Sequence, residues 1–252
     1  MLGERPIALA KNVLRRRIYA PQAYAPVRNT AVVPIVHSEC MALASWLPVV
    51  WRCRSNAVEL VTVRALLDDQ RAQPTAARAL LPLRLRAYPF IFDPARPIDV
   101  ASAGMLDDIF ADAPTDAGAT ITSVNGKLGR ATTMRLALLD RIAAETAITG
   151  AIGAALAERD LLEPWPLKFE IDGTAIGVSD LMIVRRSTFD SGALAPLVTQ
   201  HGLVCATVLG LHRISLFRAG SLLAAAKAFV NAIKAEDHKP TPRVGALAVA
   251  MS

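Results

Sequence analysis

The segment at residues 80–93, LLPLRLRAYPFIFD, constrains the fold more than any other stretch of this chain. Its apolar and cationic residues alternate, a period of two that is typical of a strand with one buried face. Pro82 also fits the first turn of a short helix, where its missing N–H costs nothing. Both interpretations end the element at Tyr88, because the residue before Pro89 is pushed toward extended backbone. Residues 90–92 are then predicted to form a buried strand, and the arginines in front of it are expected to line a site.

Composition limits the size and character of the core. A chain of 252 residues can bury one substantial core or two small ones. Hydrophobic residues make up 53% of it and aromatic residues only 5%, so the core is expected to be aliphatic. The net charge of +6 favours anionic partners. Because the charge is spread along the chain, an ordinary solvated surface is the preferred interpretation, and nucleic acid is not the expected partner.

The three cysteines, Cys40, Cys53 and Cys205, have no CxxC spacing. This pattern favours neither a disulfide scaffold nor a zinc site, and it fits a reducing cytoplasm. The basic N-terminal stretch is not followed by the apolar region of a secretory signal. The apolar runs at 147–156 and 202–211 are shorter than the roughly 20 residues of a spanning helix. We therefore expect a cytoplasmic protein without a membrane span.

The first half of the chain is predicted to be rich in short strands. Prolines and cations in residues 1–30 predict a basic, loosely ordered arm. Ser38 is a reasonable N-cap for a helix over 39–46, and residues 68–76 form a polar loop. Four aspartates between 107 and 116 are expected to form a solvated acidic loop rather than a calcium site. The predicted strands cover residues 32–37, 48–51, 58–67 and 90–92.

The second half combines helices with a hairpin. Residues 127–159 have a helical period, whose inward face is expected to carry Leu128, Leu138, Ile142, Ile152 and Leu156. Glycines at 150 and 153 either divide this helix or allow close packing. Segments 167–171 and 174–178 flank Asp-Gly and predict a hairpin, followed by a strand at 181–184.

The last part of the chain is expected to alternate between helix and strand. A helix over 193–201 should end at Gly202, a buried strand should cover 203–211, and Ser215 should cap a final helix. A flexible tail is expected over 236–252. Together these elements predict one α+β domain over residues 31–235, with a mostly antiparallel sheet in the first half, a hairpin, and helices packed on the sheet.

One arrangement of side chains suggests metal chemistry. His37 and Glu39 with the distant His212 could supply a two-histidine, one-carboxylate face that leaves positions open for substrate. A histidine two residues from a glutamate is common, so the preferred interpretation is structural: His37 ends a strand and Glu39 supports a helix start. The sequence contains no nucleophile elbow, Walker loop or dinucleotide glycine pattern, and it predicts no cofactor.

Five blocks in order resemble the SapC family of bacterial proteins, which is named from a surface-layer gene cluster. Tyr88-Pro89-Phe90 is the most specific piece. Two departures stand out: Arg185-Arg186 replaces an acidic pair, and the glycine and tryptophan usual before the Tyr-Pro-Phe block are not recognisable at 73–78. The blocks are SECMALASWLPVVW (38–51), LPLRLRAYPF (81–90), LLEPWPL (161–167), DLMIVRRSTF (180–189) and LHRISL (211–216).

The resemblance implies a cytoplasmic accessory protein connected with the export or modification of surface-layer or envelope proteins. The leading hypothesis is a non-catalytic protein that binds a peptide or protein partner. The alternatives are a metal-dependent modifying enzyme and a nucleic-acid-binding protein that uses the basic arm. We expect Glu39, Arg86 and Tyr88 to lie close together, with Glu39 and Arg86 paired. The candidate binding residues are Glu39, Arg84, Arg86, Tyr88, His212 and Ser215.

Overall fold

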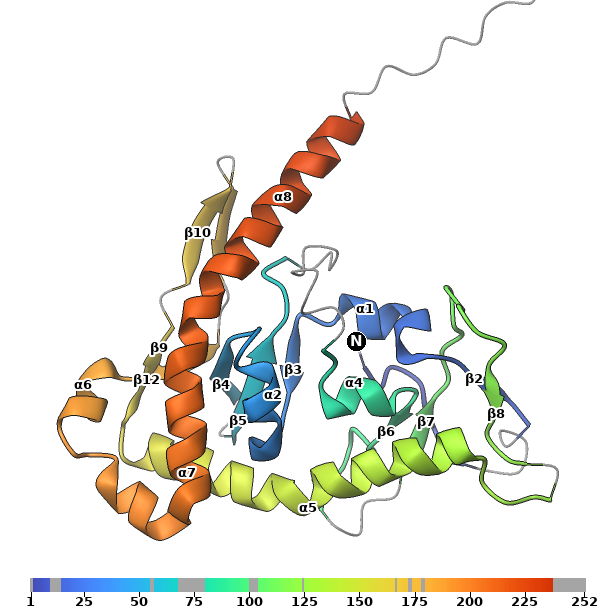
Figure 1. The fold of residues 1–252 in the computed structure, drawn as a ribbon, viewed down its shortest axis with the longest axis horizontal. Helices are drawn as coiled ribbons and strands as arrows, with labels where there is room; N and C mark the ends of the chain where they lie inside the picture. Colours follow the sequence, from blue (N-terminus) through green and yellow to red (C-terminus); the bar gives the residue numbers. More distant parts are fainter. Residues whose placement is uncertain are drawn as a thin grey trace, which may run out of the picture.

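A five-stranded antiparallel sheet forms the centre of the larger half of the molecule (Figure 1). The computed structural model describes residues 2–9, 15–54, 57–67, 80–99, 104–123, 125–165, 167–171, 174–177 and 180–237. The strand order is β3-β5-β4-β12-β9, and every neighbouring pair is antiparallel. The strands are β3 (Val32–Pro34), β5 (Ala57–Val63), β4 (Val49–Arg54), β12 (Leu181–Val184) and β9 (Leu162–Pro164).

The central pair of this sheet, β4 and β5, is rich in valine, whose branched side chain suits a pleated surface. Val50 lies opposite Val61, and both are fully buried. Helices α2 (Cys40–Leu43), α5 (Arg130–Glu158) and α7 (Ala195–Ser215) cover these strands and complete the main core. At Gly153 of α5 an added Cβ would lie only 2.9 Å from the carbonyl oxygen of Val58, so this glycine permits the close packing.

Helix α5 joins the two halves of the molecule. Its 29 residues span about 43 Å and run beneath both halves in Figure 1. Ile152 and Leu156 belong to the core around the large sheet, whereas Leu139 and Ile142 belong to a second core around Phe90. The second half contains two small sheets and the short helix α4 (Leu83–Ala87). Its strands are β1 (Pro6–Ile7), β7 (Met105–Asp107) and β6 (Phe90–Ile91), paired in that order, and β2 (Arg17–Ile18) with β8 (Ala119–Thr120).

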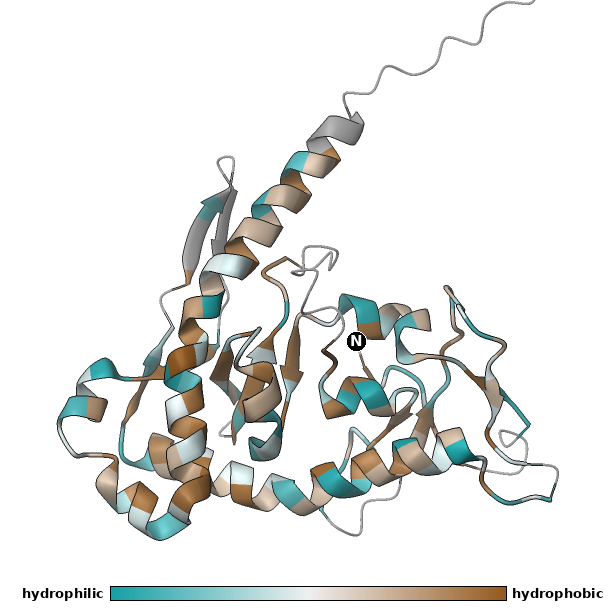
Figure 2. Ribbon diagram, viewed as in Figure 1, coloured by the Kyte–Doolittle hydropathy of each residue, from teal (hydrophilic) through white to brown (hydrophobic). Residues whose placement is uncertain are grey.

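The remaining elements lie around these two cores. Figure 2 shows that α7 contains many apolar residues. The elements are the 3-10 helices η1 (Pro21–Ala23), η2 (His37–Glu39) and η4 (Leu216–Arg218), the helices α1 (Ala25–Asn29), α6 (Arg186–Asp190) and α8 (Ala219–Asp237), and the hairpin of β10 (Lys168–Ile171) with β11 (Thr174–Gly177).

The fold confirms the predicted α+β class and the mostly antiparallel sheet. The strands expected at 32–37, 48–51, 58–67, 90–92 and 181–184 are present with small shifts of their ends, as is the hairpin. The helix expected at 127–159 is continuous and is not divided at its glycines. On that helix Leu139 is more buried than Leu138, and Leu128 lies ahead of the helix with 45% of its surface exposed.

Residues 83–87 form a helix, so the strand interpretation of this segment is wrong and the helical alternative is right. Pro82 occupies the N-cap, one position before the expected one, and Tyr88 is the C-cap. The alternation that imitated a strand has a tertiary cause. Leu83 packs into the core around Phe90, whereas Leu85 packs into a third cluster on the other side of the helix. Because Leu83 and Leu85 are buried in different clusters, apolar residues recur at every second position of the helix. The sequence therefore imitates the period of a strand.

The buried strand predicted over 203–211 is also wrong, because α7 continues through this stretch. Gly202 has φ +67° and ψ −157°, so the left-handed glycine is present, but the chain resumes its helix immediately afterwards. Cys205, Val208 and Leu209 are buried at helical spacing. A continuous apolar run hides that period, which is why the sequence pattern did not distinguish helix from strand. Ser215 ends α7 and does not cap the last helix by its side chain.

The helix predicted at 39–46 is shorter and begins differently. A 3-10 turn over His37–Glu39 leads into α2, and the N-cap position of that turn is Val36 rather than Ser38. The Ser38 hydroxyl accepts a hydrogen bond from Arg141 of α5 instead. The predicted loop at 68–76 lies outside the described residues, as does the predicted tail beyond Asp237.

The described part of residues 1–30 is docked on the body, so the expectation of a loosely ordered arm is wrong there. Strand β1 pairs with β7, and β2 pairs with β8. Tyr24 and Val27 are buried. The cause is the acidic stretch that was expected to be a solvated loop: four of its aspartates bind this segment. Asp107 accepts the backbone N–H groups of Gly3 and Arg5, Asp108 pairs with Arg16, Asp112 pairs with Arg28, and Asp116 accepts the N–H of Ala20.

Candidate functional site

Helix α4 separates two cavities, and each contains one of its two arginines. Residues two apart on a helix point in nearly opposite directions, so Arg84 and Arg86 diverge. The larger cavity, named here the Arg86 cavity, has a volume of about 440 Å³. The smaller, the Arg84 cavity, has a volume of about 220 Å³. The Arg86 cavity is lined by Pro21, Gln22, Leu81, Arg86, Ala131, Met134, Arg135 and Leu138.

The Arg86 cavity combines apolar walls with two guanidinium groups. Arg86 is exposed and takes part in no ion pair among the residues that the structure describes. Arg135 comes from α5 and donates through one nitrogen to the carbonyl oxygen of Tyr19 at 2.5 Å. Its second terminal nitrogen is shielded from solvent and has no hydrogen-bond partner in the described part of the chain. Guanidinium groups bind carboxylates through two parallel hydrogen bonds, so this pair suits an anionic ligand.

The electrostatics of Arg135 also favour an anionic ligand. Burial lowers the pKa of its guanidinium, which reflects the cost of holding a charge away from water. The group nonetheless stays protonated at neutral pH, because an arginine side chain ordinarily loses its proton only in strongly basic solution. A partly desolvated cation with an unused donor gains more from a carboxylate than a fully hydrated cation does.

The Arg84 cavity has a different charge balance. Glu59 lines it and accepts hydrogen bonds at 3.2 and 2.7 Å from two nitrogens of Arg52. Burial lowers the pKa of Arg84, while Glu59 and Glu39 act in the opposite direction. Arg84 also lies over the ring of Phe92, with 6.0 Å between guanidinium carbon and ring centre. Two carboxylates therefore already compensate Arg84, which makes this cavity less suited to an anion.

Glu39 fixes the start of α4. One carboxylate oxygen accepts the N–H of Val36 at 2.9 Å, and the other accepts the N–H of Leu83 at 2.6 Å. Burial raises the pKa of Glu39, and these two hydrogen bonds together with Arg84 partly oppose that rise. Leu83 is the first residue of α4, whose N–H groups lack partners within the helix. The role of Glu39 is therefore to position α4 and its arginines.

The predicted grouping of Glu39, Arg86 and Tyr88 is not formed. Both oxygens of Glu39 are occupied by backbone N–H groups, and Arg86 faces the cavity on the other side of α4. Tyr88 is buried and donates its hydroxyl to Asp107 at 3.0 Å. On a strand, residues 84, 86 and 88 would share one face; because the segment is helical, they separate.

His212 and Ser215 fasten α7 to the large sheet. His212 Nδ1 lies 2.7 Å from the carbonyl oxygen of Val49, and its Nε2 accepts the N–H of Val184 at 3.1 Å. Ser215 accepts the N–H of Val49 at 2.9 Å and donates to the carbonyl oxygen of His212 at 2.7 Å. Complete burial lowers the pKa of His212 to about 4, so the ring is neutral. Both side chains are inaccessible to a ligand. Their hydrogen bonds show a structural role, so the predicted binding role is not supported.

The alternative metal site at His37, Glu39 and His212 is not assembled. Both ring nitrogens of His212 interact with backbone, whereas His37 lies against α5, with Nδ1 3.1 Å from the Thr149 hydroxyl. His37 Nε2 is also 3.9 Å from a carboxylate oxygen of Glu145. Within the described ranges, no group of three histidine, cysteine or acidic side chains is placed to hold a metal ion.

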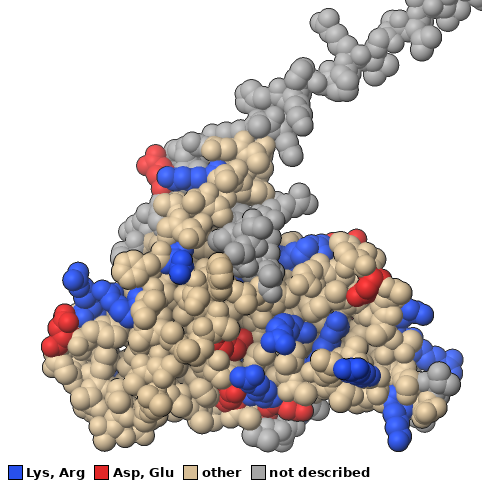
Figure 3. Space-filling model, in the orientation of Figure 1, with Lys and Arg blue, Asp and Glu red and all other residues tan. Residues whose placement is uncertain are grey.

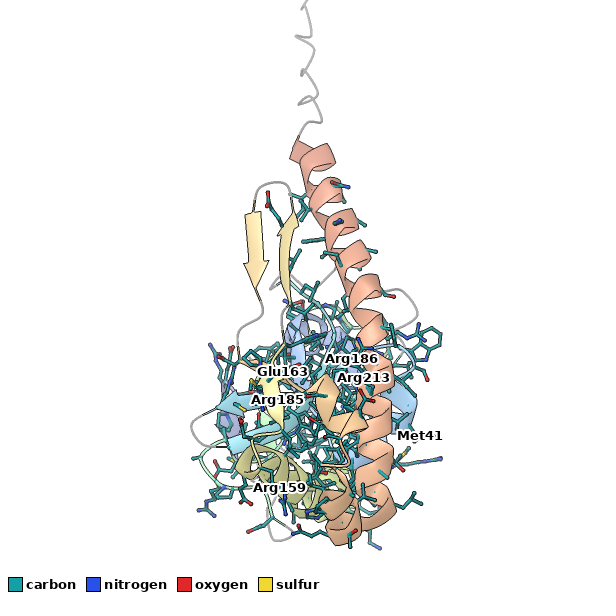
Figure 4. The ribbon with its side chains drawn as sticks, turned by 90° about the vertical axis from the view of Figure 1, so that its left-hand side faces the viewer. Met41, Arg159, Glu163, Arg185, Arg186 and Arg213 are labelled. Carbon is teal, nitrogen blue, oxygen red and sulfur yellow. The ribbon has the colours of Figure 1, made fainter. Side chains whose placement is uncertain are left out.

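Arg185 and Arg186 lie on the surface, away from α4, where α6 begins beside α7 (Figure 4). Arg185 pairs with Asp160 at 2.7 Å, and Arg213 of α7 lies over the ring of Phe189, 5.9 Å from its centre. The cationic pair that distinguishes this sequence therefore does not line either cavity.

The sequence patterns did not identify Arg135 as a site residue. A usable signal exists: Arg135 lies four residues after Ala131 and three before Leu138, on the side of the predicted helix that carries apolar residues. A charge at such a position is either paired or lines a cavity, because burial of an isolated charge is costly.

Comparison with known proteins places the chain in a family. A family model described as SapC matches residues 15–206, which include α4, α5 and both arginines of the Arg86 cavity. His212 and Ser215 lie beyond the match. No curated protein and no solved structure shows a significant match to the chain. The extent of the family match, most of the sequence, shows that the chain belongs to the SapC family.

Proposed function

We propose that this protein is a non-catalytic binding protein that holds a carboxylate-bearing peptide segment of a protein partner in the Arg86 cavity. In the cell it would act as a cytoplasmic accessory in the export or modification of surface-layer or envelope proteins, as the family resemblance implies. The observation that carries the proposal is the placement of Arg86 and Arg135, from two different helices, around one cavity with apolar walls.

The dimensions and chemistry of the cavity favour a peptide. Ligand pockets commonly measure about 300–1,000 Å³, so a volume of about 440 Å³ accommodates a few residues. Leu81, Met134 and Leu138 offer contacts for apolar side chains, while the two guanidinium groups select a carboxylate. The carboxylate is either an acidic side chain or the free C-terminus of the peptide, and the two differ in a simple test.

The test uses fluorescence polarisation with labelled peptides of leucine and glutamate, each prepared with a free and with an amidated C-terminus. Arg86→Ala and Arg135→Ala should each weaken binding by about 10- to 100-fold, the factor expected for loss of a charge-assisted hydrogen bond. Arg130→Ala is the matched control, because Arg130 is exposed on the same helix and does not line the cavity.

Melting temperatures distinguish lost binding from lost folding. Arg86 is exposed and unpaired within the described structure, so Arg86→Ala should melt close to the wild-type protein. Equal affinities of the Arg86→Ala, Arg135→Ala and Arg130→Ala variants for every peptide would overturn the proposal. A difference between free and amidated peptides would identify the C-terminal carboxylate as the recognised group.

A further inference from the structure

The outer face of α7, η4 and α8 carries large apolar side chains in contact with solvent. Leu203 is 81% exposed, Ile214 63% and Phe217 86%. The helical stretch Ala195–Ile233 is long and apolar enough to cross a membrane by length and composition, and only 11% of its most apolar window is buried. Figure 1 shows α8 extending away from the body of the molecule. This face is unusually apolar for an exposed surface.

Its inner face, however, belongs to the protein core. Cys205, Val208 and Leu209 of α7 pack with the large sheet, as do Leu222 and Ala226 of α8. His212 and Ser215 add buried hydrogen bonds to β4 and β12. Crossing a bilayer would break these contacts. A helix held in this way can lie on a membrane surface without spanning it.

The charge distribution of this face indicates which kind of surface it would bind. Residues 191–235 contain no aspartate or glutamate, although the chain as a whole has 22 acidic residues. The same stretch carries four cations: Arg213, Arg218, Lys227 and Lys234. Figure 3 shows the visible part of this face as mostly uncharged, with scattered basic groups. Such a surface complements an anionic one.

The spacing of these residues matches that of an interfacial helix. Ile214, Phe217, Ser221, Ala224 and Ala228 follow one another at intervals of three or four residues; all are exposed, and all but Ser221 are apolar. Arg218 and Lys227 are exposed and each is next to a member of this stripe, so they lie beside it on the helix surface. Arg213 is also next to the stripe, but it is half-buried and lies over the ring of Phe189. Long cationic side chains beside an apolar stripe reach lipid headgroups while the stripe enters the acyl boundary.

We propose that the α7–α8 face docks on an anionic lipid bilayer, with the helices lying in the plane of the interface. Nucleic acid fits the cations but not the exposed Phe217 and Ile214, so lipid is the better match. This inference is independent of the Arg86 cavity, because it rests on different residues on different helices.

The experiment is co-sedimentation of the full chain with vesicles of phosphatidylcholine alone or with one quarter phosphatidylglycerol. Binding is expected only with the anionic lipid and should weaken as salt rises. Phe217→Asp should reduce the partition coefficient by about 10-fold or more, since it removes an exposed aromatic ring that would insert into the bilayer and adds an anion. Lys227→Gln should reduce it by about fivefold, the factor expected for one cation near an anionic membrane.

Phe110→Asp is the matched control, because Phe110 is 84% exposed and lies in a loop far along the chain from this face. Equal sedimentation of the Phe217→Asp and Phe110→Asp variants would overturn the proposal, as would equal binding to the two kinds of vesicle. Sedimentation velocity tests the alternative that a second copy of the chain, instead of a bilayer, covers this face. A dimer that Phe217→Asp dissociates, combined with no vesicle binding, would assign this face to a second copy of the chain.

Discussion

Glu39 accepts the backbone N–H of Leu83 at 2.6 Å, across a separation of 44 residues. This hydrogen bond joins η2 to the first turn of α4 and thereby determines where the helix begins. Because α4 is only five residues long, the position of its first turn also sets the directions of Arg84 and Arg86. The buried carboxylate of Glu39 thus organises the two cavities.

Glu39→Ala should lower the free energy of unfolding by several kcal/mol. The change leaves the N–H groups of Val36 and Leu83 without their acceptors, and an unsatisfied buried donor costs about 1–3 kcal/mol. Urea unfolding measures the effect. Glu158→Ala, an exposed change at the end of α5, should shift stability by no more than about 0.5 kcal/mol. Similar losses in both variants would show that Glu39 does not position α4.

His212 should make the protein sensitive to mild acid. Its pKa in the folded protein is about 4, below the ordinary value of 6.5, so the unfolded chain binds more protons between these values. Stability therefore falls as the pH drops from about 6.5 to 4, by about 3 kcal/mol from this group. His212→Gln, although less stable at pH 7, should lose this part of the pH dependence. Unfolding curves at pH 7 and pH 5 that shift equally in both proteins would contradict the assignment.

Tyr88 should hold the N-terminal segment in place through Asp107. Tyr88→Phe removes a hydrogen bond to a carboxylate, a loss of about 1.5–3 kcal/mol. The same carboxylate accepts the N–H groups of Gly3 and Arg5, so hydrogen exchange at these two residues should accelerate. Tyr19→Phe serves as the control, because no hydrogen bond of its hydroxyl is present in the described structure. If hydrogen exchange at Gly3 is unchanged in Tyr88→Phe, then Tyr88 does not hold the N-terminal segment in place through Asp107.

Gly202→Ala should destabilise the protein without any steric clash. The backbone at Gly202, with φ +67° and ψ −157°, lies in a region that only glycine populates readily, and no atom lies within 4 Å of an added Cβ. The expected cost is about 1–3 kcal/mol. Gly210→Ala has equal space in the same helix but no positive φ, and it should gain about 0.5–1 kcal/mol. Differential scanning calorimetry of the two variants should show opposite shifts in Tm.

Local patterns determined several of the regular elements of this protein. Valine-rich segments predicted β4 and β5, the Asp-Gly turn predicted the hairpin, and the helical period predicted α5, because each signal depends on residues a few positions apart. Five blocks in order, of which Tyr88-Pro89-Phe90 is the most specific, suggested the family. The sequence also named Arg86, but for the wrong grouping, since the partner assigned to it was Glu39.

Tertiary structure decided what those local patterns could not. Arg135 joins Arg86 only because α5 passes beneath α4, and Asp107 anchors Gly3 across 104 residues. His212 attaches α7 to the sheet and is not a metal ligand, because backbone groups of Val49 and Val184, on separate strands, interact with its two ring nitrogens. Buried polar groups must find partners wherever the fold supplies them. Those partners lie far apart in sequence, so no short-range period records them.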